Sequence, residues 1–167
     1  RADAREKAFP GSFFIRGNVR EKEGKPTTAL TFDDGPDSTY TPQILDILKA
    51  QGVHATFYLQ GGFLTPQHRS VIQRIIAEGH EVGLHSLDHS DIKHDAKKHH
   101  NPAETYSRQV TETERRLTSL TVSETHPTGY VTNLYRPAYG SITREQLAYF
   151  ASQGKKIVNW SIDTEDW

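Results

Sequence analysis

Short apolar segments rich in β-branched residues alternate with amphipathic helical segments along this chain, and this alternation most constrains its fold. The apolar spacing predicts strands over 27–32, 53–59, 81–84, 133–135 and 156–162. Helices are predicted over 41–52, 65–79, 103–120 and 143–153. The first two open with a Thr-Pro pair and end at glycine, which are helix start and stop signals. Strands that alternate with helices over short connections predict an α/β fold with a parallel sheet and helices outside it.

Polar side chains follow the predicted strands at the points where the strands end. They are Asp33, Asp34, His85, Arg136 and the acidic segment 163–167. Because the carboxyl ends of parallel strands meet at one edge of a sheet, these side chains are expected to lie close together. We therefore expect the functional site at this edge.

The spacing of two histidines points to a metal site. His85 and His89 lie four residues apart, which on one helical turn places both imidazoles on the same face. With Asp34 they form a set of two histidines and one carboxylate, which leaves metal positions open for water or substrate. The chain has no cysteine, so any metal must be held by His and carboxylate side chains. Asp33, adjacent and uncommitted, is predicted to act as general base on a metal-bound water.

The residues alone leave other interpretations of the aspartate pair and the histidines open. Taken singly, an Asp-Asp-Gly-Pro turn or a pair of loop histidines is common without a metal. The ligand set also suits a non-haem iron oxygenase, which is disfavoured here because the carboxylate precedes both histidines. For His94, His99 and His100 a solvated loop is favoured over a second metal site.

Two segments near the C-terminus could complete a site. Arg136-Pro-Ala-Tyr-Gly140 offers an arginine that could pair with a strand-end carboxylate. The same segment supplies backbone N–H groups that could stabilise an oxyanion. Trp167, which ends the acidic segment 163–167, could stack on a sugar ring. Taken alone, the first segment is better explained as a Pro-Gly turn with a solvated arginine, and the second as a surface strand end.

Composition and charge exclude several classes of function. The 20 Lys and Arg residues against 21 Asp and Glu residues give a net charge of −1, so no basic excess exists for binding nucleic acid. No apolar run approaches the roughly 20 residues that cross a bilayer, and no signal-peptide core is visible. Residues 1–26 are charged and punctuated by glycine, which predicts an N-terminal arm or irregular lead-in to a domain over 27–167.

Four motifs occur in a fixed order along the chain. They are Thr31-Phe-Asp-Asp-Gly-Pro36, His85-Ser-x-x-His89, Arg136-Pro-x-Tyr139-Gly and Asp163-x-x-Asp166-Trp167. In this order they resemble the first four motifs of the NodB-type polysaccharide deacetylases, carbohydrate esterase family 4. The resemblance covers about 27–167 and makes this range a NodB-like catalytic domain. It implies a parallel (β/α) barrel of the distorted, seven-stranded polysaccharide-deacetylase type.

The resemblance also implies a reaction and a cofactor. It implies metal-dependent removal of N-acetyl groups from N-acetylglucosamine-type polysaccharides, either peptidoglycan or chitin-like, with O-deacetylation of acetylxylan as the alternative. Zinc is the favoured metal, and cobalt or another divalent ion is the alternative. The resemblance makes Asp34, His85 and His89 the metal ligands and Asp33 the general base. Such an enzyme is expected to be extracellular, periplasmic or associated with the cell wall.

Four further residues receive roles from the resemblance. Arg136 would orient and tune the general base, and the Tyr139 backbone N–H would bind the tetrahedral oxyanion. Asp166 would tune the catalytic acid. Trp167 would help to wall the acetyl pocket, so that it and Tyr139 are the expected substrate contacts.

Two departures from the family pattern affect these expectations. Ala138 replaces a proline that is frequent in the third motif. The fifth motif, a Leu-x-His that supplies the general acid, does not follow Trp167. The last strands and this acid are therefore expected on a separate segment, such as a second polypeptide that completes the barrel. The competing function is a non-catalytic glycan-binding pseudo-enzyme, which the absent acid favours and the intact Asp33 opposes.

Overall fold

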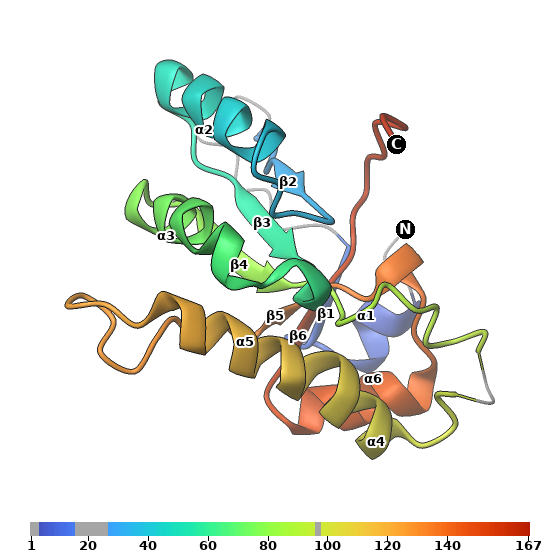
Figure 1. Ribbon diagram of the computed structural model, residues 1–167. Coiled ribbons are helices and arrows are strands. Elements are labelled where there is room, and N and C mark those ends of the chain that lie inside the picture. The colour runs from blue at the N-terminus through green and yellow to red at the C-terminus, as the bar shows by residue number, and fades with distance from the viewer. Residues whose placement is uncertain (1–3, 16–26, 96–97) are drawn as a thin grey trace.

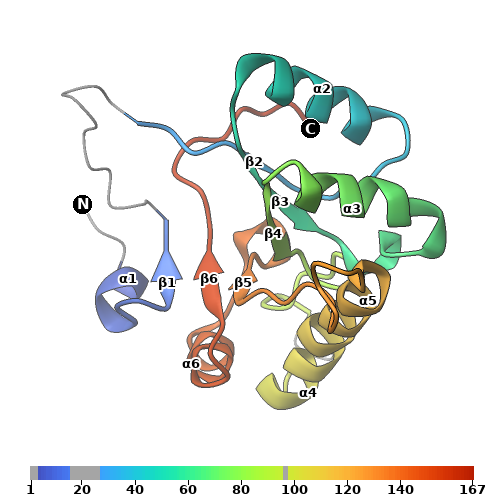
Figure 2. The same ribbon diagram turned by 90° about the vertical axis from the view of Figure 1, so that its left-hand side faces the viewer.

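A parallel sheet forms the centre of the computed structural model, which describes residues 4–15, 27–95 and 98–167. Its strands are β1 (Phe13–Phe14), β2 (Thr31–Phe32), β3 (Thr56–Leu59), β4 (Glu81–Leu84), β5 (Leu134–Tyr135) and β6 (Lys156–Val158). Their order is β1-β6-β5-β4-β3-β2, and every neighbouring pair is parallel. The sheet is curled, since β1 and β6 stand upright in Figure 2 while β2 and β3 run obliquely across the view. The predicted α/β class with a curved parallel sheet is confirmed.

Helices flank the curled sheet on its outside (Figures 1 and 2). They are α1 (Ala4–Ala8), α2 (Tyr40–Gln51), α3 (Arg69–Ala77), α4 (Pro102–Tyr106), α5 (Glu112–Thr121) and α6 (Arg144–Ser152). Short 3-10 turns form η1 (Gly61–Phe63), η2 (Pro66–His68) and η4 (Ala138–Gly140). Gly52 follows α2 in the left-handed conformation, with φ of 64°, as expected of a glycine that ends a helix. In the described part of the chain, no helix has both the length and the apolar character needed to cross a membrane.

The helix predicted over 103–120 is interrupted in the structure. Between α4 and α5 lies a π-helical stretch, η3 (Ser107–Thr111), whose Gln109 and Val110 are buried. A π-helical turn contains one residue more than an α-helical turn, so it shifts the face that side chains present. The N-terminal half of the predicted helix is mostly polar. It therefore has too few apolar residues for their spacing to reveal a change from α-helical to π-helical turns.

Four of the five predicted strands are shorter in the structure, and the difference is largest for β2 and β6. The run 27–32 yields only β2, which within the described residues is an edge strand that pairs with β3 alone. The run 156–162 pairs only as far as Val158, and residues from 161 onward are exposed. β-branched residues prefer strands because their side chains pack well on a pleated sheet. Composition therefore overestimates the length of a strand where no neighbouring strand pairs with it.

The N-terminal segment contributes regular structure where an irregular lead-in is predicted. Within 4–15, α1 is followed by β1, which pairs with β6. Phe13 is buried in the core, and the Arg5 guanidinium lies 4.6 Å from the centre of its ring. Burial of this aromatic side chain stabilises a short strand in an otherwise charged segment. The rest of the lead-in, 16–26, lies outside the described residues, and the division at residue 27 stays a prediction.

The carboxyl ends of β3, β4 and β5 bring the polar strand-end residues together. The His85 N–H donates to the Leu59 carbonyl at 2.9 Å, and the Arg136 N–H donates to the Leu84 carbonyl at 2.8 Å. These two bonds extend the parallel pairing by one residue beyond each strand. They fix His85 and Arg136 on adjacent strand ends, at the edge where the sequence predicts the site.

Candidate active site

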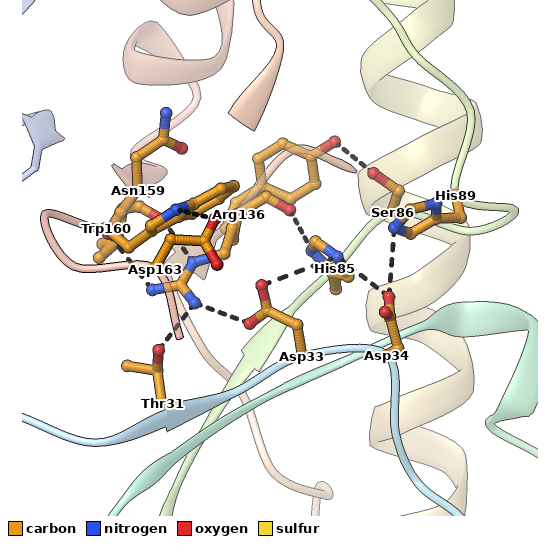
Figure 3. A network of polar contacts seen from close by, with 12 residues as sticks. Thr31, Asp33, Asp34, His85, Ser86, His89, Arg136, Asn159, Trp160 and Asp163 are labelled. Carbon is orange, nitrogen blue, oxygen red and sulfur yellow. Dashed lines mark hydrogen bonds and ion pairs between the residues drawn. The ribbon is translucent and has the colours of Figure 1, made fainter. Parts of the chain in front are cut away.

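Three side chains with metal-binding chemistry converge where β2 and β4 end (Figure 3). Asp34 Oδ1 lies 3.3 Å from His85 Nε2 and 3.2 Å from His89 Nε2. One ligand atom from each of the three lies within 4.8 Å of the other two. His85 is buried, His89 is partly buried and Asp34 is exposed, so the cluster opens toward solvent on its carboxylate side. Among the described residues, it is the only such group of three or more His, Cys, Asp or Glu.

A loop, rather than a helical turn, brings the two histidines together. Residues 85–90 contain no helix, and Ser86 and His89 adopt left-handed φ values of 62° and 56°. Asp34 is also left-handed, with φ of 69°. Such conformations cost about 1–3 kcal/mol each for residues other than glycine and persist where the surrounding packing imposes them. The expectation of a shared helical turn is therefore wrong, although the convergence that it predicts is present.

The geometry of the cluster fits a divalent metal. His85 Nδ1 lies 2.9 Å from the Arg136 carbonyl, which can only accept, so the proton of a neutral imidazole is assigned to Nδ1. The lone pair then remains on Nε2, which faces the cluster. Ligand atoms of a tetrahedral zinc ion lie roughly 3.3 Å apart at ordinary bond lengths. The two nitrogen-to-Asp34 distances match this spacing.

The charge state of Asp34 suits the same role. When His85 is protonated, its Nε2–H donates to Asp34, and this hydrogen bond is the main cause that lowers the pKa of the Asp34 carboxyl. The positive charges of His85 and His89 act in the same direction, against the opposing effect of partial burial. Asp34 is therefore held as a carboxylate, which is the form that binds a metal.

Asp33 faces a different partner from its neighbour in the chain. Its Oδ1 accepts a hydrogen bond from Arg136 Nη1 at 2.7 Å, while its Oδ2 lies 4.0 Å from His85 Nε2. The same Arg136 nitrogen donates to Thr31 Oγ1 at 2.9 Å. One oxygen of Asp33 is thus fixed, and the other is directed toward the ligand cluster, where it can accept a proton from a group bound there.

Arg136 is buried and held on several sides. Its Nε donates to the Val158 carbonyl at 2.9 Å, and its Nη2 donates to the Asn159 carbonyl at 3.3 Å. Its guanidinium carbon lies 4.0 Å from the centre of the Tyr58 ring and 5.5 Å from that of the Trp160 ring. A planar cation between aromatic rings and backbone carbonyls has little freedom to turn, so it orients Asp33 firmly.

Three of these supporting residues receive no role from the sequence, although Thr31 opens the first motif. Thr31 precedes Asp33 by two positions, so strand alternation could have placed the two side chains on one face. Tyr58 and Trp160 reach Arg136 from β3 and from the segment after β6. These contacts cross the sheet, and nothing local in the sequence marks them.

Tyr139 borders the cluster through its ring. Its ring centre lies 4.6 Å from that of His89, in an edge-on arrangement. Its backbone is left-handed, with φ of 58°, inside the turn η4. The ring is exposed, so it is available to contact a bound sugar. The substrate contact of Tyr139 stays a prediction.

The C-terminal residues Asp166 and Trp167 lie apart from these contacts. Asp166 Oδ1 accepts a hydrogen bond from Thr164 Oγ1 at 2.6 Å, and Trp167 is 96% exposed. Asp163 lies nearer the site, because its Oδ2 accepts a hydrogen bond from Trp160 Nε1 at 3.2 Å (Figure 3). The roles of Asp166 and Trp167 stay predictions.

The loop histidines beyond the cluster form no second metal site within the described residues. His94 Nδ1 contacts Asp91 Oδ2 at 2.8 Å. His99, expected in a solvated loop, is buried, and neither of its ring nitrogens has a hydrogen-bond partner. The loop that contains Ile92 and His99 packs against α6, where the Gln146 side chain donates hydrogen bonds to the carbonyls of both residues.

The family can be assigned once this geometry is compared with known proteins. The sequence profile described as polysaccharide deacetylase matches residues 20–158. This chain belongs to the polysaccharide deacetylase family. The resemblance carried by the four motifs is confirmed, and the iron-oxygenase alternative is removed.

Two named relatives of this deacetylase-family chain come from bacteria. It is 40% identical over 143 residues to a peptidoglycan-N-acetylglucosamine deacetylase of Bacillus cereus, covering 86% of this chain and 47% of the relative. It is 38% identical over 156 residues to a chitooligosaccharide deacetylase of Rhizobium leguminosarum bv. phaseoli, covering 92% and 62%.

A solved structure of the family has the same fold. The crystal structure of the Bc1960 peptidoglycan N-acetylglucosamine deacetylase, in complex with 4-naphthalen-1-yl-N-oxidanyl-benzamide, matches with a TM-score of 0.76 at 39% identity. The match covers 93% of this chain and 64% of that one. The deacetylase-family chain thus spans between 47% and 64% of the length of these three relatives.

Proposed function

We propose that the protein removes N-acetyl groups from N-acetylglucosamine-type polysaccharides, peptidoglycan or chitin-like, by metal-dependent hydrolysis. The observation that carries this proposal is the carboxylate of Asp33, fixed by Arg136 on one oxygen and directed with the other toward the ligand cluster. A positioned base beside an open metal site is an arrangement suited to the hydrolysis of an amide by water. The names of the two relatives, a peptidoglycan-N-acetylglucosamine deacetylase and a chitooligosaccharide deacetylase, support this substrate class.

Asp34, His85 and His89 would hold the metal. Zinc is favoured, because two imidazoles and a carboxylate at this spacing suit its ligand preference, and cobalt or another divalent ion is the alternative. When bound, the metal would polarise the acetyl carbonyl and lower the pKa of a bound water from 15.7 to about 7.

Residues of the chain would accept the proton of the attacking water and stabilise the negative charge that develops on the acetyl oxygen. Asp33 Oδ2 would accept the proton of the attacking water, since Oδ1 is engaged by Arg136. The Tyr139 backbone N–H would donate to the oxyanion that forms on the acetyl group. The leaving amine would take its proton from the fifth-motif histidine, which is expected on a separate segment. Asp166 would tune this acid, and Trp167 would wall the acetyl pocket.

Release of acetate tests the proposal. The protein would be incubated with N-acetylglucosamine oligomers, peptidoglycan and acetylxylan, with EDTA, and with EDTA followed by excess zinc. We expect release from the N-acetylated substrates, loss of release with EDTA and recovery with zinc. Release from acetylxylan alone would identify an O-deacetylase, and glycan binding without any release would identify a non-catalytic binding protein; either result would overturn the proposal.

We also propose an extracellular, periplasmic or cell-wall location, where a cell-wall polysaccharide would be met. Fractionation of the producing cells with an antibody to the protein would test this location. Recovery of the protein only from the cytoplasmic fraction would contradict it.

A further inference from the structure

The loop between the two metal-binding histidines has little regular structure of its own. Residues 85–90 contain no helix or strand, and Ser86 and His89 are left-handed. In a helical turn, backbone hydrogen bonds between residues four apart would fix the relative positions of His85 and His89. This loop lacks those bonds, so contacts from other elements must fix it.

Gln109 supplies two of these contacts from a position that is 0% exposed. Its Oε1 accepts a hydrogen bond from the Leu87 N–H at 2.9 Å, and its Nε2 donates to Asp88 Oδ1 at 2.9 Å. One amide group therefore binds both residues that lie midway between Ser86 and His89. Because an amide uses its oxygen only to accept and its nitrogen only to donate, the pair of bonds sets the orientation of the loop.

The π-helical stretch η3 places Gln109 against this loop. Gln109 is the central residue of η3, and its carbonyl accepts a hydrogen bond from Thr113 Oγ1 at 2.9 Å. π-helical turns that interrupt α-helices are frequent at functional sites, and the inserted residue shifts the direction of the side chains around it. Here the redirected side chain is the one that contacts the metal-binding loop.

The turn η1 supplies further contacts to the loop. The Gly61 N–H donates to the Ser86 carbonyl at 2.8 Å, and the Gly62 N–H donates to the Leu87 carbonyl at 2.7 Å. A Cβ at Gly61 would lie 2.5 Å from Thr113 Oγ1 and 2.9 Å from the Leu87 side chain, so this approach requires glycine. The loop is thus held by backbone donors of η1 and by the Gln109 amide.

We propose that Gln109 is a positioning residue, which holds the loop from 85 to 89 so that His85 and His89 converge on the metal. This inference rests on the proposed metal-dependent function. Gln109 does not contact the metal ligands directly, and it acts through Leu87 and Asp88. Its loss would leave the partly buried Leu87 amide without this partner and would allow the two imidazoles to separate.

Gln109→Met removes both amide contacts at a similar side-chain volume, and Gln146→Met is its matched control. Gln146 is also buried, at 2% exposure, and its Nε2 donates to the Ile92 carbonyl at 2.5 Å and to the His99 carbonyl at 3.2 Å. The measurement is the zinc dissociation constant, by competition with a chelating dye, on variants shown to be folded by circular dichroism.

We expect Gln109→Met to weaken zinc binding by roughly 10–100-fold, as for other residues that orient metal ligands. Gln146→Met should lower the unfolding midpoint while leaving zinc affinity unchanged. Unchanged affinity in Gln109→Met, or equal losses in both variants, would overturn the inference.

Hydrogen exchange of the wild-type protein provides a second measurement if Gln109→Met does not fold. The Leu87 amide should be protected in the metal-free protein, because its bond to Gln109 exists before metal binds. Exchange at the rate of an unstructured amide would contradict the inference.

The same experiments separate this inference from the proposed function. If zinc affinity falls in Gln109→Met but the wild-type protein releases no acetate, the positioning role stands and the proposed function fails. If acetate is released and the affinity of Gln109→Met is unchanged, the proposed function stands and the positioning role fails. A wild-type protein that binds no zinc would overturn both.

Discussion

Asp33 and Asp34 show how two identical side chains, adjacent in the chain, acquire different partners. Successive residues of a strand point to opposite faces, so the sequence predicts that the two carboxylates diverge. The left-handed backbone of Asp34 breaks this alternation, and oxygens of both residues lie within 4.0 Å of His85 Nε2. What separates their roles is Arg136, which binds Asp33 and leaves Asp34 to the two imidazoles.

A pair of substitutions separates the predicted base from the predicted ligands. Asp33→Asn should retain the metal and lose about 10²–10⁴-fold in turnover, the range typical of a positioned general base. His85→Ala should lose both metal and turnover, because one of three ligands is gone. Metal content by mass spectrometry and acetate release would be measured on the same samples. Equal metal loss in the two variants would contradict these assignments.

At the scale of elements, the register of β3 against β4 leaves space for the Tyr58 ring, which contacts the Arg136 guanidinium. Tyr58 of β3 pairs with Gly83 of β4, and a Cβ at Gly83 would lie 2.5 Å from the Tyr58 ring. Since β4 lies between β3 and β5, the ring crosses β4 at the one residue without a side chain. It thereby reaches Arg136, which follows β5.

Gly83→Ala tests this arrangement. The added methyl group should displace the Tyr58 ring and lower the free energy of unfolding by about 1–3 kcal/mol, as overpacking does elsewhere. Turnover should fall with the metal retained, because Arg136 loses its ring contact. Urea unfolding and acetate release are the measurements. In a Tyr58→Leu background the same substitution should cost much less, and an equal cost in both backgrounds would rule out the ring as the cause.

At the scale of the whole molecule, two buried imidazoles make stability depend on pH. Burial lowers the pKa of His80 and of His99 below the ordinary histidine value. His80 Nδ1 also accepts a hydrogen bond from the Ala55 N–H, which a proton on that nitrogen would break. The unfolded chain therefore binds protons more readily than the folded one, and stability falls as the pH drops.

Urea unfolding at pH 8 and pH 5.5 measures this dependence. The stabilisation by neutral histidines is present above their unfolded pKa of about 6.5, so the unfolding midpoint should be lower at pH 5.5. His99→Leu should narrow the difference between the two midpoints, whereas His100→Gln, at an exposed neighbour, should leave it unchanged. Equal midpoints at the two pH values in the wild-type protein would contradict the prediction.

Metal binding should also stabilise the whole fold. The cluster joins residues that follow β2 and β4, so a bound ion links distant parts of the chain. Zinc at 100 times its dissociation constant should raise the free energy of unfolding by about 2.7 kcal/mol. Thermal unfolding with zinc and with EDTA would measure the change. In His85→Ala the shift should vanish, and a shift that persists there would place the zinc elsewhere.

Much of the fold and the centre of the site could be predicted because their signals are local. Alternating apolar segments and Thr-Pro helix starts predict the strands and helices, and parallel order brings Asp33, His85 and Arg136 to one edge. Strand ends are less predictable, since pairing with a neighbour decides where β2 and β6 stop. The strand β1 follows from burial of Phe13, which a charged N-terminal segment does not signal.

The sequence by itself determined the fold class, the edge of the sheet that carries the site, and the residue types that gather there. Only the tertiary structure decided how these side chains are held: the left-handed loop between His85 and His89, the Tyr58 ring beneath Arg136, and the Gln109 amide against Leu87. The physical reason is the separation along the chain between the residues that interact. Backbone period and chain direction are properties of neighbouring residues, whereas these contacts depend on sheet register and on one inserted residue in a helix far along the chain.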